Sequence, residues 1–263
     1  MIGKMKENTL IKVIIPVHIF NDEVKKLIVN AVNSVPEDIS VNVSCKYGLS
    51  NELNEALNTF KNVSIVEAEE NSPSDFATLV NSAVGGTKWF SVLEFDDVYT
   101  PIWFENFKTY SETMPEVSVF LPFQDIVDYK TNDFMRFGNE APWASSFSNE
   151  IGYIDNECLQ NYSDFYLTGG IINTERYVSA GKLKTNIKVF FWYEFLLRIT
   201  NKNDKVFVIP KIGYTHHIGR DGSMVEDYSK TLTDKEIEYW FNTAKKEYFF
   251  KNEREIKPFS DKE

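Results

Sequence analysis

Short apolar runs without polar alternation constrain the fold of this chain more than any other feature. In Val13-Ile14-Ile15 three branched apolar residues follow one another, which suits a strand buried on both faces of a parallel sheet. Segments with helical periodicity separate such runs, so the first hundred residues predict repeated β-α-β units with right-handed crossovers. We expect strands at residues 10–17, 41–45, 63–66 and 89–93, and helices at 23–35, 51–60 and 72–84.

The second half of the chain is less regular. Residues 125–161 show no clear period and predict a long, polar and aromatic loop. Thr233 and Glu236 have the spacing of a capping box, which opens an amphipathic helix, and a charged tail follows from residue 251. We further expect strands at 117–123 and 206–209, an apolar helix at 189–200 and a loop at 215–224.

Composition limits the class of partner. The chain has 39 acidic and 28 basic residues and a net charge of -11, which argues against non-specific binding of nucleic acid. Cys45 and Cys158 form no CxxC pair, so we expect neither a zinc site nor a disulfide framework. No apolar run approaches the ~20 residues of a membrane helix, and the first ten residues lack the apolar stretch of a signal peptide. These observations predict a soluble, cytoplasmic protein.

Three carboxylates follow the apolar run at 89–93. Glu94 and Asp96 are two residues apart and would point the same way at the end of a strand, and Asp97 comes next. Such oxygen ligands suit Mg²⁺ or Mn²⁺ bound to phosphate, and parallel sheets bind ligands at this edge. Two plainer interpretations stay open, since an acidic chain produces such clusters by chance and Asp97 can cap the next helix.

The chain has three histidines, and the predicted topology brings all of them to the same edge of the sheet. His18 follows the first strand, and His216-His217 precede the segment Gly219-Arg220-Asp221-Gly222-Ser223. Glycines in that segment permit close approach of the backbone to an anion. A histidine in a loop is more often simply solvated, and the sequence leaves open whether His216 or His217 is the ligand.

Glu194 is an acid on an otherwise apolar helix. Burial there would raise the pKa of its carboxyl group towards the range of a general base. The alternative is an internal salt bridge with Arg198, four residues later on the same helix. The two interpretations are compatible.

Taken in this order, these features resemble the GT-A glycosyltransferases, in particular the inverting enzymes of family 2. The resemblance covers residues 12–224. It departs from the family pattern after the second strand, where the Asp that binds uracil is missing, and at Val80, where an Arg is usual. The matching positions are Pro16-Val17-His18 after the first strand, Asn81 before the acid-tipped strand, Glu94-Phe95-Asp96 in place of DxD, Glu194 to Arg198 on the acidic helix, and the late His217 and Ser223.

The resemblance implies a single-domain α/β fold of GT-A type, with a mostly parallel, Rossmann-like sheet and helices on both faces. Residues 1–125 would form the nucleotide-sugar-binding half, and residues 126–232 the acceptor-binding and catalytic half. Residues 233–263 would form a C-terminal amphipathic helix and tail. The aromatic segment 123–147 would supply the wall that binds the acceptor.

The resemblance also implies roles for single residues. Asp96 and His217 would hold Mn²⁺ or Mg²⁺ on the diphosphate of a donor, most simply a UDP-sugar. Glu194 would be the general base of a transfer with inversion. Tyr47 would stack on the base in place of the missing Asp. The residues implied to contact the nucleotide-sugar are Pro16, Val17, His18, Tyr47, Asn81, Glu94, Phe95, Gly169, Gly170 and Ser223.

Other functions remain compatible with the sequence. The acceptor would be a saccharide, a lipid-linked saccharide or, as for bacteriophage enzymes, a hydroxymethylated pyrimidine in DNA, although the net charge of -11 argues against the last. The departures from the family pattern also allow a GT-A binding module whose chemistry has decayed. A nucleotidyltransferase is disfavoured, because the residues after the first strand lack a glycine-rich basic loop.

Overall fold

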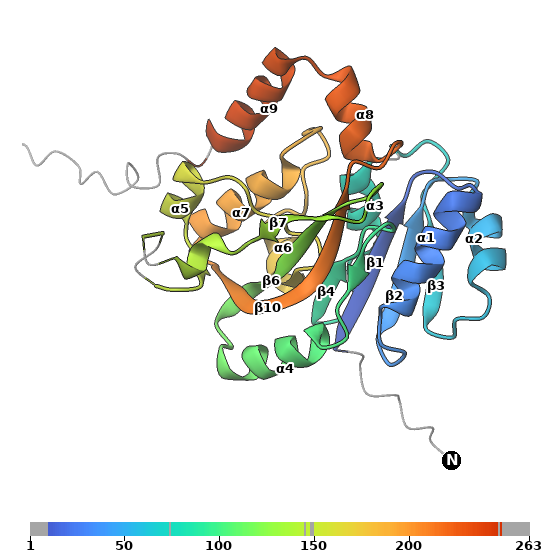
Figure 1. Ribbon diagram of the computed structural model, residues 1–263, viewed down its shortest axis with the longest axis horizontal. Helices are drawn as coiled ribbons and strands as arrows, with labels where there is room; N and C mark the ends of the chain where they lie inside the picture. The colour runs from blue at the N-terminus through green and yellow to red at the C-terminus, as the bar shows by residue number, and fades with distance from the viewer. Residues whose placement is uncertain (1–9, 74, 145, 148–149, 247, 249–263) are drawn as a thin grey trace, which may run out of the picture.

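The computed structural model describes residues 10–73, 75–144, 146–147, 150–246 and 248. Within these residues a ten-stranded sheet forms the centre of the molecule, in the order β3-β2-β1-β4-β9-β6-β10-β5, with β7 beside β6 and β8 beside β10 (Figure 1). The strands are β1 (Ile11–Val17), β2 (Ser40–Cys45), β3 (Val63–Glu67), β4 (Trp89–Val92), β5 (Val98–Tyr99), β6 (Val117–Asp128), β7 (Phe134–Gly138), β8 (Tyr153–Ile154), β9 (Ile171–Asn173) and β10 (Lys205–Ile218).

Helices cover both faces of this sheet. Val13 and Ile15 of β1 point to one face, where they join a core with α1, α2 and α4. Ile14 points to the other face, into a core with α3, α5, α6, α7 and α9. The apolar run of β1 is therefore continuous because both of its faces are buried. The helices are α1 (Asp22–Asn33), α2 (Ser50–Leu57), α3 (Phe76–Ala83), α4 (Trp103–Thr113), α5 (Asn156–Asn161), α6 (Thr174–Ser179), α7 (Phe191–Asn201), α8 (Met224–Thr231) and α9 (Asp234–Lys246), with a 3₁₀ turn at Ala141–Trp143.

The first half of the chain confirms the predicted β-α-β units. Strands β3, β2, β1 and β4 pair in parallel. The Asn21 side chain caps α1 by accepting a hydrogen bond from the Val24 amide at 2.9 Å. The predicted start of α3 is wrong, because Asp75 rather than Ser72 is its N-cap, with its carboxylate accepting from the Thr78 amide at 2.9 Å. Pro73 therefore precedes the helix instead of opening it.

The longest strand, β10, corrects the prediction of a short strand at 206–209 and a loop at 215–224. It pairs in parallel with β6 from Lys205 to Ile218 and passes Pro210 through shifts in register. Proline cannot donate to a ladder hydrogen bond, so the sequence suggested that the strand ends there. The strand continues because the bulge leaves the residues around Pro210 unpaired. His216 and His217 consequently lie on a strand and not in a loop.

Residues 125–161 also contain more regular structure than the sequence predicted. Strand β6 extends to Asp128 and forms an antiparallel pair with β7, and the 3₁₀ turn, β8 and α5 follow. Because β6 runs through residue 125, the sheet continues across the predicted boundary between the two halves, in agreement with a single domain.

The C-terminal segment begins with the predicted capping box. The Thr233 amide donates to the Glu236 carboxylate at 2.8 Å, and the Glu236 amide donates to the Thr233 hydroxyl at 3.4 Å. The charged tail and the first nine residues, about which the sequence also made predictions, lie outside the described residues. Among the described helices, none has the length and apolar character needed to cross a bilayer.

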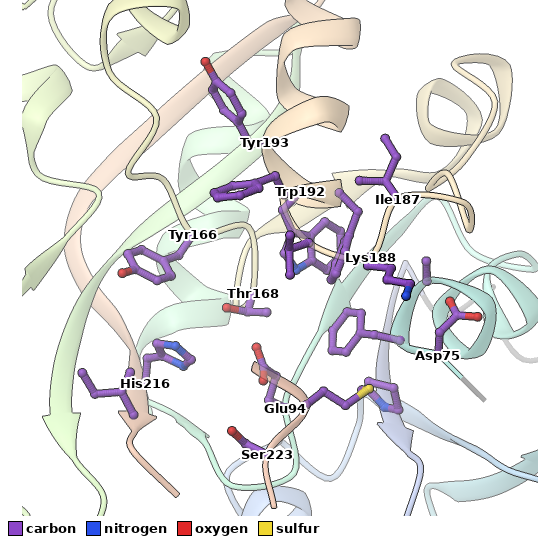
Figure 2. A pocket seen from close by; sticks show the side chains of 18 of the residues that line it. Asp75, Glu94, Tyr166, Thr168, Ile187, Lys188, Trp192, Tyr193, His216 and Ser223 are labelled. Atoms are coloured by element: carbon purple, nitrogen blue, oxygen red, sulfur yellow. The ribbon is translucent and has the colours of Figure 1, made fainter. Parts of the chain in front are cut away.

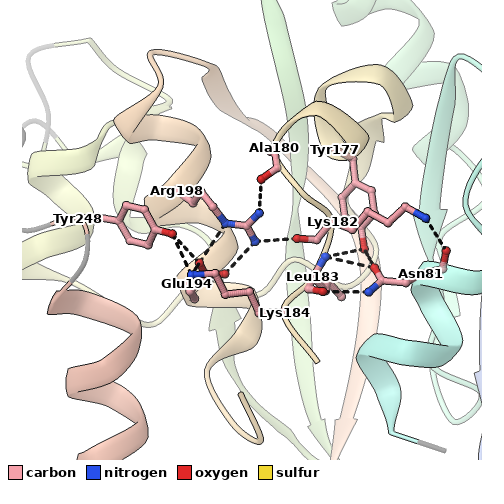
Figure 3. Close-up of polar contacts among 9 residues, drawn as sticks. All are labelled: Asn81, Tyr177, Ala180, Lys182, Leu183, Lys184, Glu194, Arg198 and Tyr248. Atoms are coloured by element: carbon pink, nitrogen blue, oxygen red, sulfur yellow. Dashed lines mark hydrogen bonds and ion pairs between the residues drawn. The ribbon is translucent and has the colours of Figure 1, made fainter. Parts of the chain in front are cut away.

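A buried cluster of charges fixes the orientation of α7 (Figure 3). Glu194 is 0% exposed and binds Arg198 through two hydrogen bonds, at 3.0 Å and 2.9 Å. Lys184 lies 3.0 Å from the same carboxylate, and the Tyr248 hydroxyl donates to it at 2.8 Å. Arg198 also donates to the Lys182 carbonyl at 2.7 Å. The cluster ties α7 to the segment before it and to Tyr248, two residues beyond the end of α9.

Asn81 of α3 forms a second polar anchor for the same segment (Figure 3). Its side chain donates to the Leu183 carbonyl at 2.9 Å and accepts from the Leu183 amide at 3.1 Å. The Tyr177 hydroxyl donates to the same amide oxygen at 2.5 Å. Both ends of the Asn81 amide group are thus engaged in holding the backbone of Leu183 against α3.

The Glu194 cluster predicts a large loss of stability when its arginine is removed. Arg198→Met leaves a buried carboxylate with a weaker set of partners, so we expect the free energy of unfolding to fall by ~3–5 kcal/mol. Arg176→Met is the matched control, because the Arg176–Asp204 pair at 3.6 Å has an arginine side chain that is 63% exposed, and we expect a loss below ~1 kcal/mol. Urea denaturation measures both values, and equal losses would contradict a structural role for Glu194.

Candidate functional site

A cavity of about 670 Å³ opens where β1, β4 and β10 bring their carboxyl-terminal residues together. One end of it is polar and is lined by His18, Glu94, Asp96, His216 and Arg220. Figure 2 shows Glu94, His216 and Ser223 entering the cavity from one side, while Trp192 enters from the other. The prediction that acids and histidines meet at one edge of the sheet is confirmed.

Asp97 is the buried centre of the polar end. It is 1% exposed and accepts hydrogen bonds from Nδ1 of His216 and from the His217 amide, both at 2.7 Å. Burial alone would raise the pKa of Asp97, but the charge and the hydrogen bonds of His216 lower it. Asp97 is not a helix cap, because the next helix, α4, has Ile102 at its N-cap position.

The two groups beside Asp97 hold their protons more tightly than usual. Burial raises the pKa of Glu94 to about 8. Burial lowers the pKa of His216, but the charge of Asp97 and its hydrogen bond outweigh burial and raise it to about 9. At neutral pH the site therefore contains a neutral Glu94 and a charged His216 next to an ionised Asp97.

The same three residues fit a divalent cation. One ligand atom each from Glu94, Asp97 and His216 lies within 4.8 Å of the others. Two carboxylates and an imidazole form a donor set that Mn²⁺ accepts, and Mg²⁺ favours the oxygens. The sequence had predicted Asp96 and His217 instead. His217 is adjacent, with Nδ1 3.5 Å from Asp97, but it does not belong to the group of possible ligands.

Asp96 is held by an arginine. Nε of Arg220 donates to its carboxylate at 2.6 Å, and the guanidinium lies 4.8 Å over the ring of Phe95. Both partners are almost completely buried, with Arg220 3% exposed, yet both line the cavity. Burial and Asp97 raise the pKa of Asp96, while Arg220 opposes the rise. A buried arginine facing a cavity can bind a phosphate with two hydrogen bonds.

His18 has unused hydrogen-bonding capacity. Among the described residues, neither of its buried ring nitrogens makes a hydrogen bond of good geometry, although the backbone of Gly222 lies near enough to act on its pKa. Burial and the nearby Arg220 lower the pKa of His18, so the ring is neutral at pH 7 and offers one donor and one acceptor. Pro16 and Ser223, which were also predicted to contact the nucleotide-sugar, line the same cavity, as does Phe95.

Several other predicted contacts lie away from the cavity. Val17 is in the core, Tyr47 is 49% exposed beyond β2, and Asn81 holds the segment at 182–183. Gly169 and Gly170 allow close packing, because a Cβ at Gly169 would collide with Tyr214 and one at Gly170 would lie 2.7 Å from Leu121. None of these five residues lines the cavity.

Glu194 does not line the cavity either. In the buried cluster it accepts hydrogen bonds from Arg198 and Tyr248. This arrangement agrees with the internal salt bridge that the sequence allowed. It gives no support to the role of general base. Successive residues of a helix are rotated by ~100° about its axis. Trp192 precedes Glu194 by two residues, so it lies on nearly the opposite side of α7 from Glu194. Trp192 therefore faces the cavity instead.

The sequence missed part of the cavity lining. Arg220 lay inside a segment identified as a ligand-binding loop, but no signal showed that it would pair with Asp96. Asp75 carries the signal of a helix cap and also lines the cavity, as do Phe76, Phe191 and Trp192. These aromatic residues have the spacing of an ordinary core. The predicted acceptor wall at 123–147 contributes no lining residue.

The structure can be compared with known proteins at the level of fold. The sequence matches no protein-family model and no curated protein. The fold matches S. aureus TarS 1–349 in complex with UDP-GlcNAc, with a TM-score of 0.63 and 13% identity over 89% of this chain and 65% of that chain. The complex of TarS 1–349 with UDP matches with a TM-score of 0.58 and 13% identity over 88% of this chain and 78% of that chain.

A further structure of S. aureus TarS also matches, with a TM-score of 0.56 and 12% identity over 94% of this chain and 46% of that chain. The chain thus spans less than half of that longer protein. At these identities the comparison establishes the fold, and the chain has the fold of a GT-A glycosyltransferase.

Proposed function

We propose that this protein binds a nucleotide diphosphate sugar, most simply a UDP-sugar, and transfers the sugar to an acceptor hydroxyl with inversion. The observation that carries the proposal is the polar end of the cavity, where Glu94, Asp96, His216 and Arg220 meet at the carboxyl edge of the sheet. S. aureus TarS, which shares the fold, has been crystallised with UDP and with UDP-GlcNAc, and this likeness supports the choice of donor.

The charges of the polar end suit a diphosphate. Arg220 would bind phosphate oxygens with its guanidinium, and His216 would add a second positive group as long as it carries its proton and no metal is bound to it. His18 would supply a further hydrogen bond, since its ring nitrogens make none of good geometry within the described residues. Glu94, Asp97 and His216 would hold Mn²⁺ or Mg²⁺, which when bound supplies a Lewis acid for the leaving diphosphate. Asp96, the ligand predicted from the sequence, would have to leave Arg220 to join them.

A second candidate is a GT-A binding module without transfer activity. The observation that favours it is the side of α7 that faces the cavity, which carries Phe191 and Trp192 and no carboxylate. Such a module would bind UDP-sugars and leave them intact. Turnover of the donor separates the two functions, because binding is common to both.

Arg220 gives the first test of donor binding. UDP with Mn²⁺ should raise the melting temperature of the wild type, since a ligand stabilises the state that binds it. Arg220→Met removes charge-assisted hydrogen bonds worth ~1.5–3 kcal/mol each, so UDP affinity should fall ~10–100-fold. Titration of each variant against its own ligand-free baseline gives the affinities, with Arg176→Met as a control expected to match the wild type. Unchanged affinity in Arg220→Met would contradict the proposed donor site.

The raised pKa values give a test of the metal site. A metal binds the deprotonated forms of its ligands, so Mn²⁺ must displace protons from Glu94, with a pKa of about 8, and from His216, with a pKa of about 9. The affinity for Mn²⁺ should rise as the pH increases from 7 to 9 and then level off. Calorimetry in two buffers of different ionisation enthalpy measures the protons released. An affinity that stays constant over this range would show that Mn²⁺ binds elsewhere or does not bind.

A further inference from the structure

The end of the cavity away from the acids is apolar. Phe76 of α3 and Phe191 and Trp192 of α7 line it, together with Ile187 and Val189 from the segment before α7. Figure 2 shows Ile187 and Trp192 on the side of the cavity opposite Glu94. A donor diphosphate at the polar end would leave this apolar space for the group that receives the sugar.

Three aromatic rings from two helices form the apolar surface. Phe76 stacks on Phe191 with ring centroids 5.4 Å apart and planes at 29°. Trp192 meets the same Phe76 edge-on at 5.5 Å. Such offset and edge-to-face arrangements are the favourable geometries for aromatic pairs, so a further flat ring could extend the cluster.

The backbone at the start of α7 holds these rings in an unusual position. Phe190 has a φ of 64° and a ψ of 15°, in the left-handed region that a bulky residue rarely adopts. The strain is opposed by packing of Phe190 against Phe241 of α9, with centroids 5.4 Å apart. The sharp entry into α7 turns Phe191 and Trp192 towards the cavity, and strained backbone of this kind is concentrated at functional sites.

The polar side chains of α7 offer few free hydrogen-bonding groups to the cavity, because Glu194 does not line it and Tyr193 lines it with a hydroxyl group that is already engaged. The Tyr193 hydroxyl donates to the Leu159 carbonyl at 2.6 Å, and Glu194 is held by its buried partners. A saccharide in the apolar end would leave several of its hydroxyl groups without hydrogen bonds, which is costly in a buried site. Other polar side chains line the wall between the two ends, where Figure 2 shows Asp75, Thr168 and Lys188 between Glu94 and Trp192.

We propose that the acceptor is a small aromatic alcohol of the phenol class, whose ring packs against Phe76, Phe191 and Trp192 and whose hydroxyl group points to the polar end. This inference rests on the proposed function. A single hydroxyl group on a flat apolar ring matches a cavity with one polar end and one aromatic end. A phenol also ionises near pKa ~10, so it needs less help from a base than a sugar hydroxyl does.

We assign Asp75 as the residue that accepts the proton of the phenol hydroxyl group during the transfer. Asp75 lines the cavity next to Phe76, and its carboxylate accepts hydrogen bonds from the Thr78 amide at 2.9 Å and the Thr78 hydroxyl at 2.8 Å. Within the described part of the chain it forms no ion pair, so it keeps the negative charge and the lone pairs needed to accept a proton. The phenol oxygen forms a bond to the anomeric carbon as the bond from that carbon to the diphosphate oxygen breaks. The diphosphate leaves with the electron pair, and the phenolic proton passes to Asp75. The product is an aryl glycoside together with the nucleoside diphosphate.

The test compares acceptors at a fixed concentration of UDP-GlcNAc, or of the UDP-sugar that stabilises the protein most. 4-Methylumbelliferone represents the phenols, and methyl glucoside and N-acetylglucosamine represent the saccharides. Mass spectrometry detects the glycoside, and the fluorescence of 4-methylumbelliferone reports its binding without any turnover. We expect glycosylation of the phenol and none of the saccharides.

Variants at four positions locate the acceptor site. Trp192→Ala, with the milder Trp192→Leu in case the first does not fold, should weaken phenol binding ~10-fold and leave the affinity for UDP within about twofold. Phe134→Ala is the control, because Phe134 lies on β7 and is 54% exposed. Asp75→Asn keeps an N-cap and should lower kcat ~10²–10⁴-fold. Asp155→Asn, the same change at the N-cap of α5, should leave kcat unchanged.

The outcomes separate this inference from the proposed function. Transfer to a saccharide and not to the phenol would overturn the acceptor class and leave the glycosyltransferase in place. Failure of every UDP-sugar to bind would overturn the proposed function. In that case phenol binding that is lost in Trp192→Ala would still support the aromatic site, and absence of phenol binding would overturn it as well.

Discussion

The buried cluster around Glu194 decides which residues of α7 can take part in chemistry. Two hydrogen bonds from Arg198, an ion pair with Lys184 and the hydroxyl of Tyr248 hold this carboxylate in the core. An ionised group in such a place persists only when it is fully paired, so the helix cannot rotate to present Glu194 elsewhere. The opposite side of α7 consequently faces the cavity and makes that end aromatic.

The polar end of the cavity follows the same rule of pairing. Asp97 is matched by His216, and Asp96 is matched by Arg220. The polar end therefore pairs two carboxylates with two cationic groups. A diphosphate would compete with Asp96 for Arg220, and a metal would compete with protons on Glu94 and His216. Donor and metal binding would then reinforce one another, because the positive metal attracts the negative diphosphate and the Asp96 carboxylate that leaves Arg220.

The sequence predicted the parallel half of the sheet, because consecutive branched apolar residues such as Val13, Ile14 and Ile15 are typical of a strand that is buried on both faces. It also predicted the acid edge, since the end of β4 determines where Glu94 and its neighbours lie. It could not predict the course of β10, where the bulge at Pro210 depends on pairing with β6, which is distant in sequence. The direction of Glu194 was open for a similar reason, because two of its partners, Lys184 and Tyr248, lie outside α7 and only tertiary packing brings them to it.

The central claim is that a nucleotide diphosphate sugar binds at the carboxyl edge of the sheet with its sugar directed towards α7. A crystal structure of the protein with UDP-GlcNAc and Mn²⁺ measures this most directly. The account predicts a diphosphate in contact with Arg220, the metal on Glu94, Asp97 and His216, and the sugar next to Trp192. A nucleotide bound outside the cavity, or a diphosphate that does not touch Arg220, would contradict it.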